Sequence, residues 1–292
     1  MPYTMIVSAK QVPDTKNITG QAMKEDGTVN RGALPAIFNP EDLNALEAAV
    51  DIKDKFGGTV TVITMGPPAA SELLREALYR GADRVVLLTD RRFAASDTLA
   101  TSYALSMAVR KLGHFDIVFC GRQAIDGDTA QIGPQLAEKL DVSQFTYVEQ
   151  ILKLDGKNIQ VRRSIEGGYE VVEGVLPALL TITGTANTPR PPSVKRLAKF
   201  KKARSLVELQ KQQNYEAPNV IEDLKARGLL IEEWNADDMG CDPAWCGGSG
   251  SPTKVKKIEA VKVAATEHRR IEAAQEPLTQ FVKELIADHT VG

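Results

Sequence analysis

Residues 115–140 read FDIVFCGRQAIDGDTAQIGPQLAEKL, and this order of residue types decides the fold class. The apolar run Asp116–Cys120 predicts a strand that is buried on both faces of a sheet. A polar loop broken by glycines follows, and the capping-box spacing of Asp128 and Gln131 predicts that the next helix opens there. A strand, a polar loop and a helix in this order are typical of an α/β sheet that binds a phosphorylated nucleotide at its carboxyl edge.

The same alternation of strands and helices extends toward the N-terminus. Short runs rich in Val, Ile and Thr predict strands at Met5–Val7, Thr59–Thr64 and Arg84–Leu88. Apolar residues at i, i+3 and i+4 predict helices at Glu41–Phe56, Pro68–Arg80 and Thr98–Leu112. This order predicts a parallel sheet with helices on both faces.

The sequence pattern changes near Tyr147, where strands are no longer separated by helices. Successive strands are expected at Val148–Leu154, Asn158–Arg163, Tyr169–Val175 and Ala178–Thr183, with a hairpin turn at Gly167-Gly168. Residues 205–270 contain little apolar material, which predicts an extended arm that packs on another chain. An amphipathic helix over Gln275–Ile286 ends this arm.

Composition excludes several classes of protein. The 292 residues are 43% hydrophobic with a net charge of −2, so the charge balance gives no sign of nucleic acid or an anionic membrane as a bulk partner. We expect no leader and no transmembrane segment, and three cysteines argue against a disulfide framework, so the expected location is the cytoplasm.

Three predicted helix starts carry polar groups that suit an anionic ligand. The first is the loop after Cys120, where Arg122 and Thr129 lie beside the expected helix start. The second is Asp97–Ser102, whose hydroxyls could contact a phosphate or a ribose, although helix capping alone explains Asp97 and Thr98. The third is Asn39–Asp42, with Pro40 near the first helical position. All three should meet at one edge of a parallel sheet, and this coincidence favours a ligand over ordinary polar loops.

Other motifs give weaker indications of a functional site. Cys241 and Cys246 lack the further ligands that a structural zinc site needs, so no metal is expected. The basic residues of Lys195–Arg204 are typical of either a solvated face or a patch that docks an acidic partner. The sequence contains no arrangement of a hydrolytic nucleophile with its base, so we expect no catalytic side chain, and any chemistry should come from a bound cofactor.

The chain resembles the β subunit of electron-transfer flavoproteins. Val161–Val172, followed by Pro177–Thr181, fits the signature of that family. Further matching stretches are Lys10–Asp14, Asn39-Pro40, Met65–Pro67, Gly81–Asp83 and Gly121–Pro134. The resemblance implies a heterodimer with an α subunit, a three-layer fold of the adenine-nucleotide hydrolase-like type, and electron transfer between dehydrogenases, such as acyl-CoA dehydrogenase, and a redox acceptor.

The resemblance also implies which residues line the nucleotide site. These are Ser8, Asn39, Pro40, Glu41, Asp42, Met65, Gly121, Arg122, Gln123, Ala124, Ile125, Asp126, Gly127, Asp128, Thr129, Ala130, Gln131 and Ile132, to which the helix start adds Asp97, Thr98 and Thr101. Pro191 and Val194 fall where the family docks on its dehydrogenase. The implied organisation is a nucleotide-binding domain over 1–189, a basic partner-recognition loop over 190–204, and a C-terminal arm over 205–292 that packs on the α subunit.

The nucleotide itself is FAD or AMP. The loop from Gly121, together with Asp97–Ser102 and Gly250–Thr253, resembles the FAD-holding branch, whereas AMP-type members carry an extra acidic residue where Gly127 stands. That branch includes bifurcating flavoproteins that oxidise NADH, and others that do not react with NADH. The residues alone leave open an AMP-holding carrier that does not bifurcate electrons and a nucleotide-sensing module without redox chemistry. The lack of a pyrophosphate loop near the first strand argues against a stand-alone adenylating enzyme.

Overall fold

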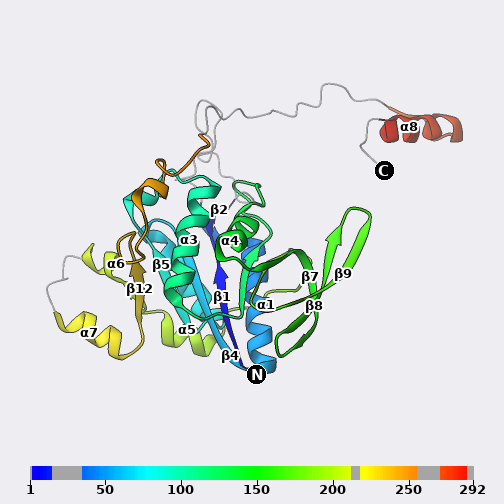
Figure 1. The fold of residues 1–292 in the computed structure, drawn as a ribbon. Coiled ribbons are helices and arrows are strands. Elements are labelled where there is room, and N and C mark those ends of the chain that lie inside the picture. Colours follow the sequence, from blue (N-terminus) through cyan, green and yellow to red (C-terminus); the bar gives the residue numbers. More distant parts are fainter. Residues whose placement is uncertain (1, 15–34, 212–217, 255–269, 288–292) are drawn as a thin grey trace.

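A ten-stranded, mostly parallel sheet forms the centre of the molecule (Figure 1). The computed structural model describes residues 2–14, 35–211, 218–254 and 270–287. In spatial order the strands are β11 (Arg204–Ser205), β12 (Leu230–Trp234), β5 (Arg84–Leu88), β4 (Gly58–Met65), β1 (Tyr3–Ser8), β6 (Ile117–Gly121), β10 (Ala178–Ile182), β7 (Ser143–Asp155), β8 (Asn158–Ile165) and β9 (Gly168–Val175). A separate antiparallel pair consists of β2 (Gln11–Pro13) and β3 (Ala36–Phe38).

Helices cover both faces of the sheet (Figure 1). One face packs against α1 (Pro40–Phe56) and α2 (Ser71–Arg80), and the other against α3 (Thr98–Leu112) and α4 (Ile132–Leu140). The remaining helices are η1 (Pro68–Ala70), η2 (Arg91–Phe93), α5 (Val194–Phe200), α6 (Leu206–Gln210), α7 (Pro218–Ala226), η3 (Pro243–Trp245) and α8 (Gln275–Ala287). This three-layer arrangement confirms the predicted fold class.

Local sequence explains the central elements. Every residue of β6 is buried, as expected for a central parallel strand that is covered on both faces. Helix α1 begins with Pro40, which tolerates the first position because its missing N–H would have no partner there. Gly167 has a φ of 77°, which suits the tight turn between the antiparallel strands β8 and β9. The predicted hairpin is therefore confirmed.

The region after residue 190 differs from the expected loop and arm. Residues 190–204 include helix α5, and β12 extends the sheet by pairing in parallel with β5. Ile231 of this strand and Leu229 just before it are almost fully buried, and Leu230 and Trp234 pack on the core beside them, so a few apolar residues seat a short strand whose sequence shows little periodicity. The arm as predicted from residue 205 is therefore wrong for 205–234. Helix α8 stands apart from the body in Figure 1 and has no buried residue.

Among the described residues, no helix is long and apolar enough to cross a membrane.

Candidate functional site

The candidate site lies at the carboxyl edge of the sheet, where the chain changes direction. From β1 the chain first adds β4 and β5 on one side, and β6 then pairs with the other side of β1. Such a switch point opens a crevice at the carboxyl ends of the strands and is the usual ligand position in open α/β sheets. Ser8 ends β1 and pairs with Cys120 of β6 and Ile63 of β4, so the structure places this predicted site residue at the switch point.

Asn39 fixes the loop that follows β6. Its side chain is fully buried, its Nδ2 donates to the carbonyl of Gln123 at 2.9 Å, and its Oδ1 accepts from the N–H of Ile125 at 3.1 Å. Its own N–H donates to the carbonyl of Lys10 at 3.0 Å. Asn39 precedes α1, as predicted, and it bridges two loops; its contact with the nucleotide remains a prediction.

Asp42 is a buried carboxyl group beneath the same loop. Its Oδ1 accepts from the N–H of Gly121 at 2.9 Å and its Oδ2 from the N–H of Lys10 at 2.8 Å. Burial raises the pKa of Asp42 to about 7, because desolvation of the carboxylate outweighs these hydrogen bonds and the bond with Asn39. The carboxyl group thus joins the end of β6 to the loop that follows β1.

Glu41 holds the first residues of the loop from the other side of α1. Its Oε2 accepts from the N–H of Gln123 at 3.0 Å, and its carboxylate pairs with the guanidinium of Arg122 at 3.1 Å. That guanidinium also lies 5.8 Å from the ring centroid of Tyr147. Arg122 therefore has a carboxylate and an aromatic ring as partners, and the expected contact with a phosphate remains a prediction.

The tip of the loop differs from the predicted capping box. The carbonyl of Ala124 accepts from the N–H groups of Gly127 and Asp128, and this turn places Asp128 in the left-handed region with a φ of 47°. The carboxylate of Asp128 accepts from Nε2 of Gln123 at 2.9 Å instead of capping a helix. Helix α4 begins at Ile132, and Gln131, at its N-cap, makes no side-chain cap. The capping-box prediction was wrong because the turn within the loop decides the conformation of Asp128.

Backbone groups at the start of α4 suit an anion. Among the described residues, the N–H groups of Thr129, Ala130 and Gln131 have no hydrogen-bond acceptor. They precede a nine-residue helix, whose amino end carries a partial positive charge. Gly133 lets this helix lie against β10, because a Cβ there would fall 2.4 Å from Cγ2 of Thr181. These residues therefore fit a bound phosphate or pyrophosphate.

The start of α3 lies beside the start of α4. Asp97 caps α3 as predicted, with its Oδ1 accepting from the N–H of Ala100 at 3.0 Å. The Thr98 hydroxyl donates to Oε1 of Gln131 at 2.9 Å. Thr101 lies one turn along the same helix and is half-buried. The predicted meeting of the three helix starts at one edge is therefore confirmed by direct contacts.

The sequence-predicted site omitted a fourth segment, Gly250–Thr253. The Ser251 hydroxyl accepts from the N–H of Asp97 at 2.8 Å, and the Thr253 hydroxyl donates to Oδ2 of Asp97 at 2.7 Å. This segment is far from α3 in sequence, and its only sequence indication was the resemblance of Gly-Ser-Pro-Thr to FAD-holding relatives. These contacts place the segment at the start of α3.

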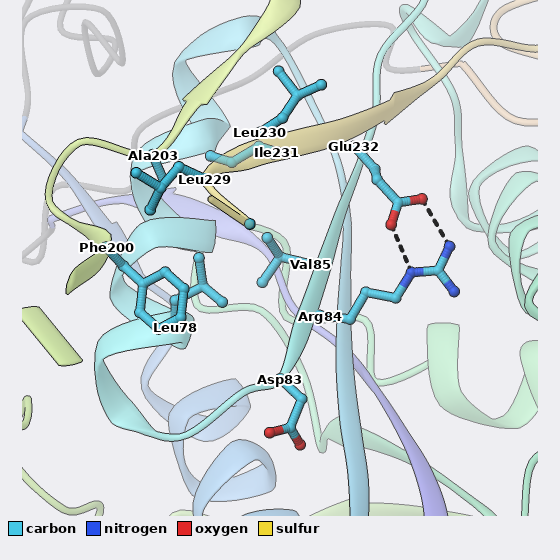
Figure 2. Close-up of a pocket in the computed structure, with 11 residues that line it drawn as sticks. Leu78, Asp83, Arg84, Val85, Phe200, Ala203, Leu229, Leu230, Ile231 and Glu232 are labelled. Carbon is cyan, nitrogen blue, oxygen red and sulfur yellow. Dashed lines mark hydrogen bonds and ion pairs between the residues drawn. The ribbon is translucent and has the colours of Figure 1, made fainter. Parts of the chain in front are cut away.

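Two cavities mark opposite ends of the sheet. A cavity of about 240 Å³ touches the site: its lining includes Lys10 and the half-buried Met65 at the end of β4. Figure 2 shows the other, of about 180 Å³, with Leu78, Val85 and Phe200 around it and the Arg84–Glu232 ion pair at its side. It lies where β5 begins, away from the carboxyl edge. This second cavity is therefore a gap in the packing between β5, β12 and α5 and not part of the candidate site.

Comparisons with known proteins identify the family of this chain. A family model described as the electron transfer flavoprotein domain matches residues 26–210. The chain is 42% identical over 287 residues to the electron transfer flavoprotein subunit beta of Clostridium acetobutylicum, covering 98% of this chain and 99% of that relative. It is 42% identical over 284 residues to the protein FixA of Bradyrhizobium diazoefficiens, covering 95% and 89%. It is 45% identical over 252 residues to subunit CarD of the caffeyl-CoA reductase-Etf complex of Acetobacterium woodii, covering 86% and 85%.

Proposed function

The chain belongs to the electron transfer flavoprotein β-subunit family, and we propose that its carboxyl-edge site binds FAD for electron transfer with a partner α subunit. The observation that carries the proposal is the row of three N–H groups without an acceptor, Thr129, Ala130 and Gln131, at the start of α4. These N–H groups would hold the pyrophosphate, and Thr98 and Ser8 lie at the same edge. FAD supplies the redox chemistry, since no side chain of the site is a redox centre.

The residue at the loop tip favours FAD over AMP. AMP-type members carry an acidic residue there, whereas this chain has Gly127, although the space would admit a side chain, since a Cβ would meet no atom within 4 Å. Gly250–Thr253, docked on Asp97, adds a wall to the site that also resembles the FAD-holding branch. AMP would occupy the adenosine and first phosphate positions alone.

A nucleotide count separates these two versions. The chain is purified with its α subunit, the nucleotides are released with acid, and FAD and AMP are each quantified against protein. We expect two FAD molecules per heterodimer; one FAD with one AMP would contradict the proposal. Anaerobic addition of NADH to the same preparation then shows whether the flavins are reduced directly, and an unchanged flavin spectrum would restrict the protein to electron carriage without NADH oxidation.

Helix α8 supports the proposed pairing with an α subunit. Leu278, Val282 and Ile286 follow one another at four-residue spacing and are each about half exposed, so they form an apolar stripe along one side of the helix. A helix with such a stripe is stabilised mainly by packing the stripe on another surface. We therefore propose that residues 275–287 dock on the α subunit.

A pair of matched substitutions tests the docking of α8. Val282→Asp puts a charge into the stripe, whereas Gln280→Asp puts the same charge on the opposite side of the helix. We expect Val282→Asp to weaken the affinity for the α subunit at least tenfold, because an aspartate would be buried without a partner. Gln280→Asp should leave the affinity within about twofold. Equal affinities of both variants in a titration with labelled α subunit would refute the docking of α8.

Docking on a dehydrogenase is proposed for the start of α5. Val194 is 83% exposed at the first helical position, Pro191 lies just before it, and Lys195 and Lys199 add positive charge. The relative from Acetobacterium woodii is named as part of a complex with a caffeyl-CoA reductase, and we propose a partner of the acyl-CoA dehydrogenase kind for this chain. We therefore expect the Val194→Asp substitution to slow electron transfer from such a dehydrogenase. Faster or unchanged electron transfer would argue against docking at the start of α5.

A further inference from the structure

Cys241 and Cys246 lie together at the carboxyl edge of the sheet, on a segment that the proposed electron transfer does not use. Both side chains belong to the same buried apolar cluster, are 7% and 3% exposed, and influence each other's pKa. Only four residues separate them, namely Asp242 and the three residues of the short helix η3 that it caps. Sγ of Cys246 also lies 3.4 Å from the carbonyl of Asp242. A compact turn thus brings both cysteine side chains into one buried cluster.

The residues that follow Cys246 are packed tightly on the start of α3. A Cβ added to Gly247 would lie 2.1 Å from the carbonyl oxygen of Arg92, and one added to Gly250 would lie 2.1 Å from the backbone of Trp245. Ser251 and Thr253 then bind Asp97, the cap of α3. Residues 247–253 therefore lead directly from Cys246 to the contact with the start of α3.

We propose that Cys241 and Cys246 are a reversible dithiol–disulfide site, and that the disulfide holds residues 247–253 on the start of α3. The oxidant is a low-molecular-weight disulfide. The Cys241 thiolate attacks one of its sulfur atoms, forming a mixed disulfide and releasing one thiol. The Cys246 thiolate then attacks Sγ of Cys241, forms the Cys241–Cys246 bond and releases the second thiol. Two cysteine protons end on the two released thiols, so the pair loses two electrons to the reagent.

The surroundings of the pair set its rate of oxidation. Burial raises the pKa of the Cys241 thiol to about 12 and also raises the pKa of Cys246. Because the thiolate is the reacting species, the exchange is slow near neutral pH and should accelerate about tenfold for each pH unit in alkaline buffer. Cys120 is buried within β6 away from this turn and provides an internal reference.

Titration of free thiols in the full-length protein tests the site. The chain contains three cysteines, and equilibration with glutathione disulfide in mildly alkaline buffer should remove two of the three thiols. The mass should fall by two hydrogen atoms without a glutathione adduct, and dithiothreitol should reverse the change. Cys120→Ala should still lose both remaining thiols, whereas Cys241→Ser should gain at most an adduct. Three persistent thiols in the folded chain, while the same reagent oxidises the denatured chain, would overturn the proposal, as would disulfide-linked pairs of chains.

Amide hydrogen exchange tests the coupling to the nucleotide site without reference to which nucleotide binds. The N–H of Thr253 and the N–H of Asp97 both donate across the contact between residues 247–253 and α3. We expect both amides to exchange several-fold more slowly in the disulfide form, because the closed turn restricts opening of the segment. Equal exchange rates in the reduced and oxidised chains would overturn the coupling.

Discussion

Gly121→Ala is expected to lower the free energy of unfolding by about 3 kcal/mol or more and to abolish nucleotide retention. A Cβ at this position would lie 2.4 Å from Oδ1 of Asp42 and 2.7 Å from the backbone carbon of Glu41. Neither neighbour can move easily, because Asp42 is buried and Glu41 lies in the first turn of α1. The substitution would therefore push apart α1 and β6 and break the hydrogen bond from the Gly121 N–H to the Asp42 carboxyl group.

Gly127→Ala is the matched control for this substitution. Gly127 lies in the same loop, and a Cβ there would meet no atom within 4 Å. We expect it to change the free energy of unfolding by less than about 0.5 kcal/mol. Urea unfolding of both variants measures the difference, and nucleotide content after purification measures retention. Similar stabilities for the two variants would mean that α1 can shift away from β6 at little cost.

Local patterns predicted the central part of this fold well. Ile117–Gly121 is a continuous apolar run that is buried on both faces, and its neighbours have the same character, so the parallel sheet follows from the sequence. Asp97 is a good cap directly before a periodic apolar segment, and it caps α3 in the structure. In these elements local preference and tertiary packing agree, which is why they could be predicted.

The shape of the nucleotide loop could not be predicted, since distant residues decide it. Asn39 holds Gln123 and Ile125 from 84 and 86 positions away in sequence, and Asp42 holds Gly121 from 79 positions away. The local spacing of Asp128 and Gln131 instead suggested a helix cap that does not form. A single sequence gives the residue types of such contacts but not their pairing.

The prediction for the C-terminal region was wrong for a different physical reason. Strand β12 lies at the side of the sheet and needs only a few buried residues, so its sequence lacks the long apolar run of a central strand. Ser251 and Thr253 are likewise ordinary polar residues until the fold brings them to Asp97. Their contribution to the site depends on tertiary contact alone.

The last prediction concerns pH and the buried carboxyl group of Asp42. Burial raises its pKa from 3.8 to about 7, so the folded chain retains a proton that the unfolded chain loses. Stability from this group is therefore fully present below pH 4 and is lost as the pH rises through about 7. A difference of about three pKa units corresponds to roughly 4 kcal/mol between these limits.

The variant Asp42→Asn isolates this effect, since it keeps the shape of the side chain and cannot ionise. Free energies of unfolding of both proteins are measured by urea at intervals from pH 5 to pH 8, where the other titrating groups contribute equally and cancel in the difference. We expect the native chain to lose about 1.4 kcal/mol per pH unit relative to Asp42→Asn up to pH 7, and less beyond it. If the free energy of unfolding of the native chain does not fall relative to that of Asp42→Asn as the pH rises, the N–H groups of Gly121 and Lys10 stabilise the carboxylate enough to offset its desolvation. Because Gly121 ends β6 and Lys10 lies just after β1, the same ionisation should also loosen the nucleotide loop, so nucleotide affinity should fall over the same pH range in the native chain and remain flat in Asp42→Asn.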